Sequence, residues 1–352
     1  MSIYYLFSGF DKEQGFTTKI AAELRKDIKN TKSLVYIASA PEGYGKTDFY
    51  RTVNTAWFEK IGITFSNISV IDHRINPEEA LNIIKNASVI FLMGGTTLAQ
   101  MAFISEYGLT GPLQNFNGVI MGISAGAINM GKTSLCTKDT ETEKTLLYDG
   151  IGLIDFTIEP HFDPDDRDLI ESALIPISYH TDIYCLCDNS AIIARPATGI
   201  CLGGVRILSG GSFRHNYCKT RIFPLGKLKY YRFVVIFAKY NGQWLYSRHR
   251  RRNTWETAGG HIEPEETALE AAKRELWEET GATEFDICPL FDYSVYTSTE
   301  FSNGQVFYAN IRGLGSLPES EMSEVMTCET YPDQLTYPEI LPVLFNEVKV
   351  LI

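Results

Sequence analysis

The chain lacks the sequence features of membrane and secreted proteins. Its 352 residues contain no apolar run that approaches the roughly 18 residues of a membrane-spanning helix. The stretch Met1–Phe7 is apolar, but it is short and has no basic flank, so it predicts a first β-strand rather than a signal peptide. We therefore expect a cytoplasmic protein with no membrane partner.

Cysteine pairs with the CxxC spacing are also absent. The seven cysteines are widely scattered, their number is odd, and no CxxC pair occurs. This pattern indicates reduced thiols and argues against a structural zinc site.

Positive charge is in short supply, since 32 Lys and Arg against 43 Asp and Glu leave a net charge of −11. A protein that binds a nucleic-acid polymer needs basic surface to displace counterions, so we expect no such partner. The remaining composition, 44% hydrophobic and 21% charged, is that of a globular protein. The length predicts two domains.

The first 130 residues alternate short apolar runs with helical stretches. The predicted strands are Ile3–Ser8, Leu34–Ser39, Ile68–Asp72, Val89–Met93 and Val119–Ile123. The predicted helices are 17–30, 47–61, 77–86 and 97–107. This alternation predicts an α/β fold with a parallel sheet covered on both faces.

Two glycine-containing loops follow the last two predicted strands, at the sheet edge where ligands bind in such folds. The segment Gly122–Gly126 has the pattern Gly-x-Ser-x-Gly, whose small residues permit the sharp turn that exposes the hydroxyl of Ser124. A tight turn without catalytic role is an equally good reading of this pattern. If Ser124 is a nucleophile, we expect the N–H groups of Ala125 and Gly95 to form its oxyanion hole.

A serine nucleophile needs a base and a carboxylate that orients the base. His161 follows an apolar strand and is the candidate base. Asp188 ends another predicted strand and is the first choice for the carboxylate, with Asp163 and Asp182 as alternatives. The competing interpretation is that the aspartates cap turns and that the histidine serves packing.

Four motifs of this half of the chain together resemble those of the S51 serine peptidases, the group of dipeptidase E and cyanophycinase. These motifs are Gly94–Thr97, Gly122–Ala127, Glu159–Asp163 and Leu186–Asn189. The resemblance implies a three-layer α/β fold related to class I glutamine amidotransferases, and a short peptide as substrate. It also implies Ser124 as nucleophile, His161 as base and an acid near Asp188. We assign this domain to residues 1–218, because a Pro- and Gly-containing stretch near residue 220 indicates a linker.

A second pattern follows the glycine pair Gly259-Gly260. Thr267 predicts the N-cap of a helix that begins at Ala268, and Gly281 suits the left-handed conformation beyond its end. At about 100° per residue, three carboxylates share one face of that helix, those of Glu275, Glu278 and Glu279. They repel one another unless a hard cation such as Mg²⁺ or Mn²⁺ binds them. A solvated acidic face is the alternative.

The complete pattern is a glycine, five residues, Glu266, seven residues, Arg274-Glu275, an aliphatic residue, any residue, Glu278-Glu279, any residue, a glycine and a small residue. It resembles the full Nudix box of hydrolases that split a nucleoside diphosphate linked to another moiety. The resemblance implies an α/β/α sandwich, assigned to residues 222–352. It implies that Glu275, Glu278, Glu279 and the Gly259 carbonyl bind Mg²⁺, with Glu266 and Arg274 in support.

Further candidates flank this box. Arg248 and Arg250 belong to a cationic run and are the candidate phosphate ligands, because a guanidinium binds phosphate bidentately. Solvated loop charge is the alternative. Trp255 precedes the glycine pair and is expected to stack on a base or to pack. Nudix enzymes often recruit an extra glutamate as base or metal ligand, and here Glu324 is the first choice and Glu321 the second.

These patterns predict a fusion of an N-terminal parallel-sheet three-layer α/β domain and a Nudix sandwich. The expected activity is Mg²⁺-dependent hydrolysis of a small nucleotide derivative, with serine peptidase activity as a second function. The alternative is a nucleotide sensor, or a scaffold whose peptidase-like domain is inactive. The sequence leaves open the nucleotide, the peptide specificity and the oligomeric state.

Overall fold

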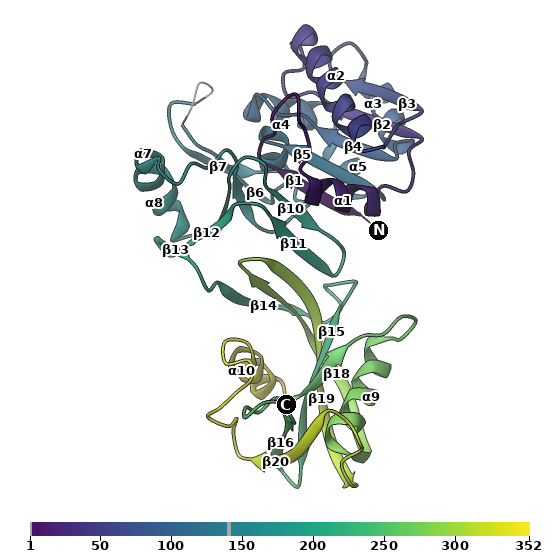
Figure 1. The fold of residues 1–352 in the computed structure, drawn as a ribbon, viewed down its shortest axis with the longest axis vertical. Coiled ribbons are helices and arrows are strands. Elements are labelled where there is room, and N and C mark those ends of the chain that lie inside the picture. Colours follow the sequence, from purple (N-terminus) through teal and green to yellow (C-terminus); the bar gives the residue numbers. More distant parts are fainter. Residues whose placement is uncertain (1, 139–141) are drawn as a thin grey trace. The chain divides into compact units, whose positions relative to one another are not determined.

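The computed structural model describes residues 2–138 and 142–352. The chain divides into two compact units, shown in Figure 1. One comprises Met1–Arg195 and Gly199–His215, and the other comprises Pro196–Thr198 and Asn216–Ile352. Residues 216–218, which the sequence analysis assigned to the first domain, therefore lie in the second unit. No helix in the part of the chain that the structure describes combines the length and apolar character needed to cross a bilayer.

The first unit is built on a sheet with the strand order β11-β10-β1-β5-β4-β2-β3. Five of these strands are parallel: β1 (Ile3–Phe7), β2 (Ser33–Ile37), β3 (Asn67–Ile71), β4 (Val89–Leu92) and β5 (Val119–Ile123). The strand β10 (Ala191–Ala194) pairs antiparallel with β1, and β11 (Thr198–Leu202) pairs antiparallel with β10. The five predicted strands are thus present, and their carboxyl ends share one edge.

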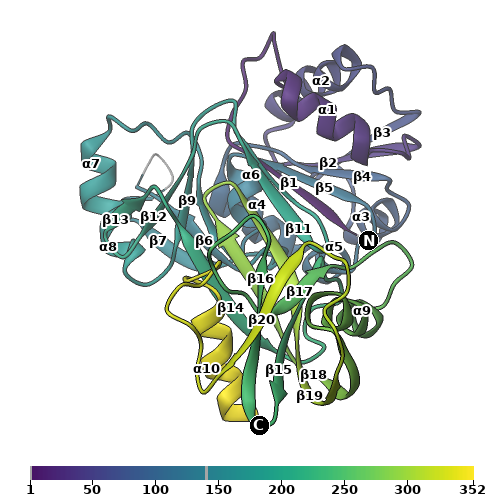
Figure 2. The ribbon, with the colours of Figure 1, turned by 60° about the horizontal axis from the view of Figure 1, so that its bottom comes forward.

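Helices cover both faces of this sheet. They are α1 (Thr18–Asp27), α2 (Tyr44–Lys60), α3 (Pro77–Lys85), α4 (Thr97–Glu106), α5 (Thr110–Gln114) and α6 (Ala125–Asn129). Figure 2 shows α1 and α2 on one side of the strands and α3, α4 and α5 on the other. On the first side, alternate strand residues such as Tyr5, Phe7 and Phe91 pack with Trp57 and Phe58 of α2. The predicted three-layer α/β architecture is confirmed.

The rest of the first unit consists of smaller elements beyond the main sheet. A four-stranded sheet contains β8 (Thr157–Glu159), β9 (Ile183–Leu186), β12 (Val205–Ser209) and β13 (Ser212–Arg214). A hairpin pairs β6 (Thr133–Cys136) with β7 (Leu146–Asp149). A helical segment comprises α7 (Arg167–Leu169), the π-helix η1 (Ile170–Leu174) and α8 (Ile175–Ser178).

The second unit is organised around β15 (Phe233–Tyr240). This strand pairs with β16 (Gln243–His249), β17 (Ala258–His261) and β19 (Glu300–Leu314). The sheet continues through β18 (Ala282–Thr297), β14 (Cys218–Pro224) and β20 (Met322–Cys328). In Figure 1, the helices α9 (Ala268–Thr280) and α10 (Leu341–Leu351) lie on opposite sides of these strands. Each helix has its own apolar core against the sheet, which confirms the predicted α/β/α sandwich.

The helix α9 begins and ends at the residues that the sequence indicated. The hydroxyl of Thr267 accepts the N–H of Glu270, and the Glu270 carboxylate accepts the N–H of Thr267 in return, which forms a capping box. At the other end Gly281 has φ 76°, and its N–H donates to the Trp277 carbonyl. Local sequence therefore fixes the start of the helix that carries the acidic residues.

Replacing Thr267 by Ala is expected to lower the free energy of unfolding by about 1 kcal/mol, because an N-terminal N–H of α9 then lacks its acceptor. The control Thr267→Ser keeps a hydroxyl and should retain most of the stability. Urea unfolding followed by tryptophan fluorescence measures this change, since Trp244, Trp255 and Trp277 all lie in the second unit. Identical midpoints for T267A and the parent chain would contradict the prediction.

Candidate active sites

The first candidate site begins at the turn between β5 and α6. Ser124 occupies this turn with φ 51° and ψ −115°, a conformation that L-residues adopt only when their surroundings enforce it. Its N–H points back to the end of β1, where it donates to the carbonyls of Phe7 (3.0 Å) and Ser8 (3.1 Å). The strained backbone directs the serine side chain away from the sheet, as a nucleophile elbow does.

Two glycines make this turn possible. A Cβ on Gly122 would lie 2.5 Å from the carbonyl carbon of Gly126, and a Cβ on Gly126 would lie 2.2 Å from the Leu92 carbonyl oxygen. Because both clashes involve backbone atoms, no side-chain rotation relieves them. The two glycines of the Gly-x-Ser-x-Gly pattern therefore have a steric reason in this fold.

Ser124, His161 and Asp188 lie in a hydrogen-bonded row. The Oγ of Ser124 is 3.0 Å from Nε2 of His161, and Nδ1 of His161 is 2.7 Å from Oδ1 of Asp188. The carboxylate accepts the Nδ1 proton, so Nε2 is left as the acceptor for the serine hydroxyl. This is the geometry that a nucleophile, a base and an orienting acid require.

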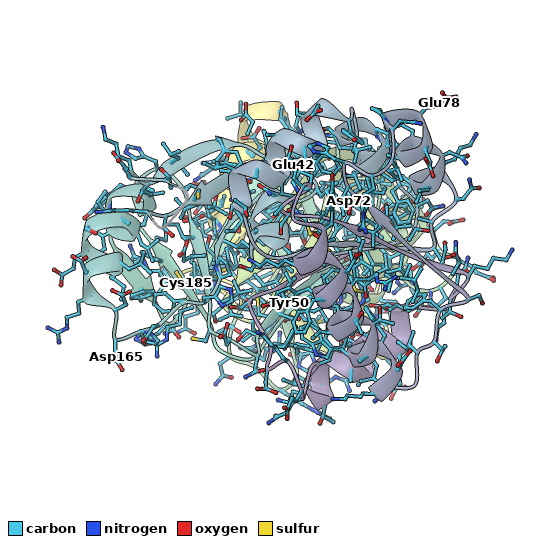
Figure 3. The ribbon with its side chains drawn as sticks, turned by 90° about the horizontal axis from the view of Figure 1, so that it is seen from above. Glu42, Tyr50, Asp72, Glu78, Asp165 and Cys185 are labelled. Carbon is cyan, nitrogen blue, oxygen red and sulfur yellow. The ribbon has the colours of Figure 1, made fainter. Side chains whose placement is uncertain are left out.

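The two alternative acids have other partners. Asp163 accepts the N–H of Asp165 at 3.0 Å in an exposed turn, and Figure 3 shows Asp165 at the periphery. Asp182 is buried, and its Oδ1 accepts the hydroxyl of Ser209 at 2.6 Å. Of the three candidates, the structure brings only Asp188 to the imidazole of His161.

A cavity of about 240 Å³ opens beside Ser124 and His161. The loop after β4 forms one wall, where Gly95 has φ 138° and a Cβ on it would lie 2.4 Å from the Ser39 hydroxyl. That hydroxyl donates to the Gly94 carbonyl at 2.7 Å, which holds the loop beside the serine. The predicted Gly95 is thus next to the nucleophile, while Ala125 is the first residue of α6.

The opposite wall was not predicted. It carries Lys12 together with four residues of α2, namely Lys46, Tyr50, Asn54 and Trp57. Figure 3 labels Tyr50 on this helix. The two lysines supply positive charge within the cavity, and no local motif marks them, because the fold alone brings α2 to the serine.

The second candidate site lies on α9, where one arginine contacts three carboxylates. Arg274 forms a bidentate ion pair with Glu266, with both N–O distances at 2.9 Å. Its Nη1 also contacts Glu275 at 2.7 Å and Glu278 at 3.1 Å. The guanidinium holds the pKa of Glu266 below its usual value. Glu266 and Arg274 thus lie where a supporting pair is needed.

Glu279 is set apart from this network. It is 6% exposed, and its carboxylate accepts the N–H of Gly259 at 3.1 Å. Burial raises the pKa of Glu279 to about 9, and burial also raises the pKa of Glu275. Gly260 lets Glu275 approach the strand, since a Cβ there would lie 2.1 Å from a carboxylate oxygen. The site therefore holds negative charge that Arg274 only partly balances.

The donor set fits a divalent cation. Carboxylate oxygens are hard ligands that suit Mg²⁺ or Mn²⁺, and a buried carboxylate such as Glu279 gains most from a compensating charge. Within residues 2–138 and 142–352, no group of three His, Cys, Asp or Glu side chains already surrounds one point. Instead the Arg274 guanidinium contacts both Glu275 and Glu278. The Gly259 contact seen here is made by its N–H rather than by the predicted carbonyl.

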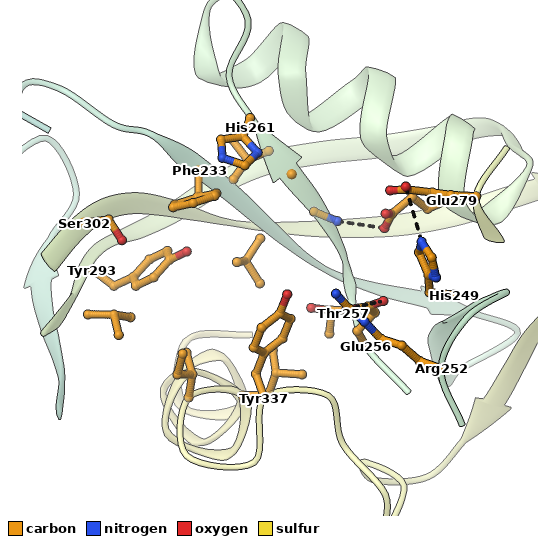
Figure 4. Close-up of a pocket in the computed structure, with 18 of the residues that line it drawn as sticks. Phe233, His249, Arg252, Glu256, Thr257, His261, Glu279, Tyr293, Ser302 and Tyr337 are labelled. Atoms are coloured by element: carbon orange, nitrogen blue, oxygen red, sulfur yellow. Dashed lines mark hydrogen bonds and ion pairs between the residues drawn. The ribbon is translucent and has the colours of Figure 1, made fainter. Parts of the chain in front are cut away.

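A cavity of about 450 Å³ adjoins Glu279 and is shown in Figure 4, whereas Glu275 and Glu278 do not belong to its lining. Glu279 lines it together with Gly259 and Gly260, and Tyr337 contributes an aromatic ring. An ion pair between the exposed Arg252 and the buried Glu256, 3.1 Å apart, also lines the cavity. Such a space suits a small molecule with an aromatic group and a charged group.

Several predicted residues of this unit lie outside that cavity lining. Arg248 pairs with Glu324 and lies over the Trp255 ring, at 5.3 Å from its centroid. Arg250 donates to the Met322 carbonyl at 3.1 Å. The strand pairing of β16 with β20 shifts register between Arg248 and the next residue, and such a bulge redirects side chains.

Three neighbours of those residues line the cavity in their place, namely His249, Arg252 and Glu321. The imidazole of His249 is labelled in Figure 4, and its Nε2 lies 3.3 Å from Oε2 of Glu321. The sequence signal for them was the cationic run and the acidic loop, but neither segment indicates which of its members line the cavity.

Comparison with known proteins identifies both units. The model of peptidase family S51 matches residues 6–199, and that of the NUDIX domain matches residues 229–340. A Bacillus subtilis (strain 168) protein, named as the 8-oxo-dGTP diphosphatase YtkD, is 36% identical over 81 residues, which are 23% of this chain and 51% of that protein. The phosphatase NudJ of Escherichia coli (strain K12) is 44% identical over 50 residues, 14% of this chain and 27% of that protein.

The chain thus spans about half the length of the first relative and about a quarter of the second. Among solved structures, a peptidase from an acI-B1 actinobacterium is 18% identical, with a TM-score of 0.46. The similarity covers 61% of this chain and 93% of that one.

In the metal-free protein, the stability contributed by Glu279 is expected to fall as the pH rises. Its pKa is raised from 4.5 to about 9, so between these values the folded chain holds a proton that the unfolded chain has released. This contribution is complete below the unfolded value and is lost as the pH passes through the folded value, by up to about 1.4 kcal/mol per pH unit.

Urea unfolding in a chelator, at about pH 6 and about pH 8.5, measures this slope. Glu279→Gln removes the titrating group and should flatten the difference between the two conditions. A parent chain and an E279Q variant with the same pH dependence would contradict the role assigned to this buried carboxyl group.

Proposed function

The chain belongs to peptidase family S51 and carries a NUDIX domain in its second half, so it is a hydrolase, and we propose that the NUDIX domain splits the diphosphate of a nucleoside diphosphate derivative with Mg²⁺ or Mn²⁺. The observation that carries this proposal is the buried carboxylate of Glu279 at the wall of a 450 Å³ cavity. Burial raises the pKa of this group to about 9, so its ionised form needs a compensating cation, and a cation beside a ligand-sized space favours a phosphate-bearing substrate.

We assign the metal to Glu275, Glu278 and Glu279. When bound, the cation would polarise the diphosphate and acidify a water molecule. The protein's part is to hold the three carboxylates from one helix, and Arg274 fixes the side chains of Glu275 and Glu278 through Nη1. Glu321 replaces Glu324 as our candidate for accepting the proton of the attacking water, since it lines the cavity.

The nucleoside portion is assigned to the far part of the same cavity. Tyr337 offers a ring on which a base can stack, and Arg252 offers donors to an acceptor of the base or to a phosphate. Because the Bacillus subtilis relative is named as an 8-oxo-dGTP diphosphatase, oxidised nucleoside triphosphates are the first compounds to be tried.

Glu278→Gln is expected to lower turnover of the best nucleotide substrate by at least about a hundredfold, since loss of one ligand weakens the metal site. The substrate is found by screening nucleotide sugars, dinucleotides and oxidised nucleoside triphosphates with Mg²⁺ and measuring the nucleotide products by chromatography. The matched control is Glu284→Gln, an exposed glutamate on β18. Equal turnover in E278Q and the parent chain would overturn the assignment, and calorimetric binding without product would favour a sensor.

For the first unit we propose a serine peptidase, because Ser124, His161 and Asp188 form a complete hydrogen-bonded triad. Ser124 attacks the peptide carbonyl while His161 accepts the hydroxyl proton and then gives it to the leaving amine. The N–H groups of Ala125 and Gly95 are assigned to the developing oxyanion.

The lysines of the cavity suggest the substrate class. Lys12 and Lys46 both line the space beside Ser124, and an ammonium group favours a carboxylate ligand. We therefore propose a short peptide with an acidic residue on the acyl side of the cleaved bond.

A fluorophosphonate probe is expected to label the parent chain at Ser124, because the triad activates that hydroxyl toward phosphorus. Labelling should disappear in Ser124→Ala and persist in Ser172→Ala, which changes an exposed serine of η1. Mass spectrometry of the tryptic peptides locates the adduct, and aspartyl dipeptides test turnover. An unlabelled parent chain that still folds would refute the peptidase proposal.

A further inference from the structure

The end of β1 meets all three members of the proposed triad. Ser8 is fully buried there, and its hydroxyl has two partners. It accepts the backbone N–H of His161 at 2.7 Å and donates to Oδ1 of Asp188 at 3.0 Å. The same carboxylate oxygen accepts Nδ1 of His161 at 2.7 Å. Ser8 therefore connects the base and the acid through a path separate from their direct bond.

The backbone around Ser8 holds the remaining parts. The carbonyls of Phe7 and Ser8 accept the N–H of Ser124, and the carbonyl of Gly9 accepts the N–H of Asn189 at 2.8 Å. One short turn of the chain is thus bonded to the nucleophile, the base and the residue that follows the acid.

Gly9 adds a steric constraint to these bonds. A Cβ at this position would lie 2.6 Å from Cε1 of His161 and 2.7 Å from Oδ1 of Asp188. The imidazole and the carboxylate therefore lie directly on the backbone of this turn, with no space for a side chain between them.

The triad region needs such a constraint, because its backbone is strained. Ser124, His161 and Asn189 have φ values of 51°, 54° and 65°, and they are three of only five non-glycine residues with positive φ in the described chain. Conformations of this kind persist only when the surroundings enforce them. The side chains of His161 and Asp188 are also about half exposed, so water competes for their hydrogen bonds.

We infer that Ser8 is a positioning residue for the triad: its hydroxyl orients Asp188 toward His161 and anchors the strained backbone of His161. This inference rests on the proposed peptidase function of Ser124. In this assignment Ser8 acts on the reaction only through His161 and Asp188. Its hydroxyl does not contact the substrate.

The chain offers a matched control for a test of this role. Ser190 is also a fully buried serine, and it lies two residues beyond Asp188. Its hydroxyl has no hydrogen-bond partner within the described residues. Ser190→Ala thus removes the same kind of atom from the same neighbourhood without loss of a hydrogen bond, whereas Ser8→Ala removes the two bonds of the Ser8 hydroxyl to His161 and Asp188.

The experiment compares the parent chain, S8A and S190A by two measurements. The first is the rate of fluorophosphonate labelling at Ser124, which should fall about tenfold or more in S8A, the rate equivalent of a hydrogen bond to a charged group. The second is the low-field proton NMR signal of His161 Nδ1–H, assigned with a His161→Gln variant. It should shift or broaden in S8A and keep its position in S190A, with thermal melting as the check on folding.

The NMR signal is also recorded in a Ser124→Ala background, where no reaction occurs. An S8A chain with the parent labelling rate and an unchanged signal would overturn the positioning role. A parent chain without labelling would overturn the peptidase proposal alone, because the NMR comparison still decides whether Ser8 orients the Asp188–His161 pair.

Discussion

Both candidate sites depend on the direct contact of functional side chains with bare backbone at glycines. In the first unit, Gly9 lies against the imidazole of His161, and Gly122 lies against the backbone that carries Ser124. In the second, Gly260 leaves the space that a carboxylate oxygen of Glu275 occupies. A methyl group at any of these positions would displace the reacting group or distort the strand. The glycines are therefore as much a part of each site as the polar residues are.

The two sites balance charge in different ways. The histidine and aspartate of the triad are half exposed, so water shares in the solvation of their charges and geometry has to come from the backbone turn at Ser8 and Gly9. At α9, one guanidinium contacts three carboxylates, while Glu279 stays apart and burial raises its pKa, so its ionised form lacks a compensating charge. The first site therefore depends on the orientation of its side chains, whereas the second depends on a cation that compensates its carboxylates.

The features that could be predicted from the sequence are those that depend on residues close together in the chain. The extent of α9 follows from its capping box and terminal glycine, and the parallel sheet follows from the alternation of apolar runs and helices. The choice among three aspartates needed the fold, because it depends on which strand end meets His161. The loops beside β16 and β20 bring Arg252 and Glu321 to one cavity, and the placement of α2 brings Lys46 to the other, beside Ser124. Such tertiary contacts leave no mark in the spacing of residues.

The source of the nucleophile explains why the proposed sites differ so much in burial. A serine hydroxyl is attached to the chain, so a strained turn can aim it, and an exposed histidine needs only to receive its proton. Water has no such attachment. A site that uses water must hold it by charge, and charge acts over useful distances only where other water is excluded. The burial of Glu279 beside a cavity is the arrangement that this second requirement favours, and the half-exposed His161 and Asp188 are the arrangement that the first one permits.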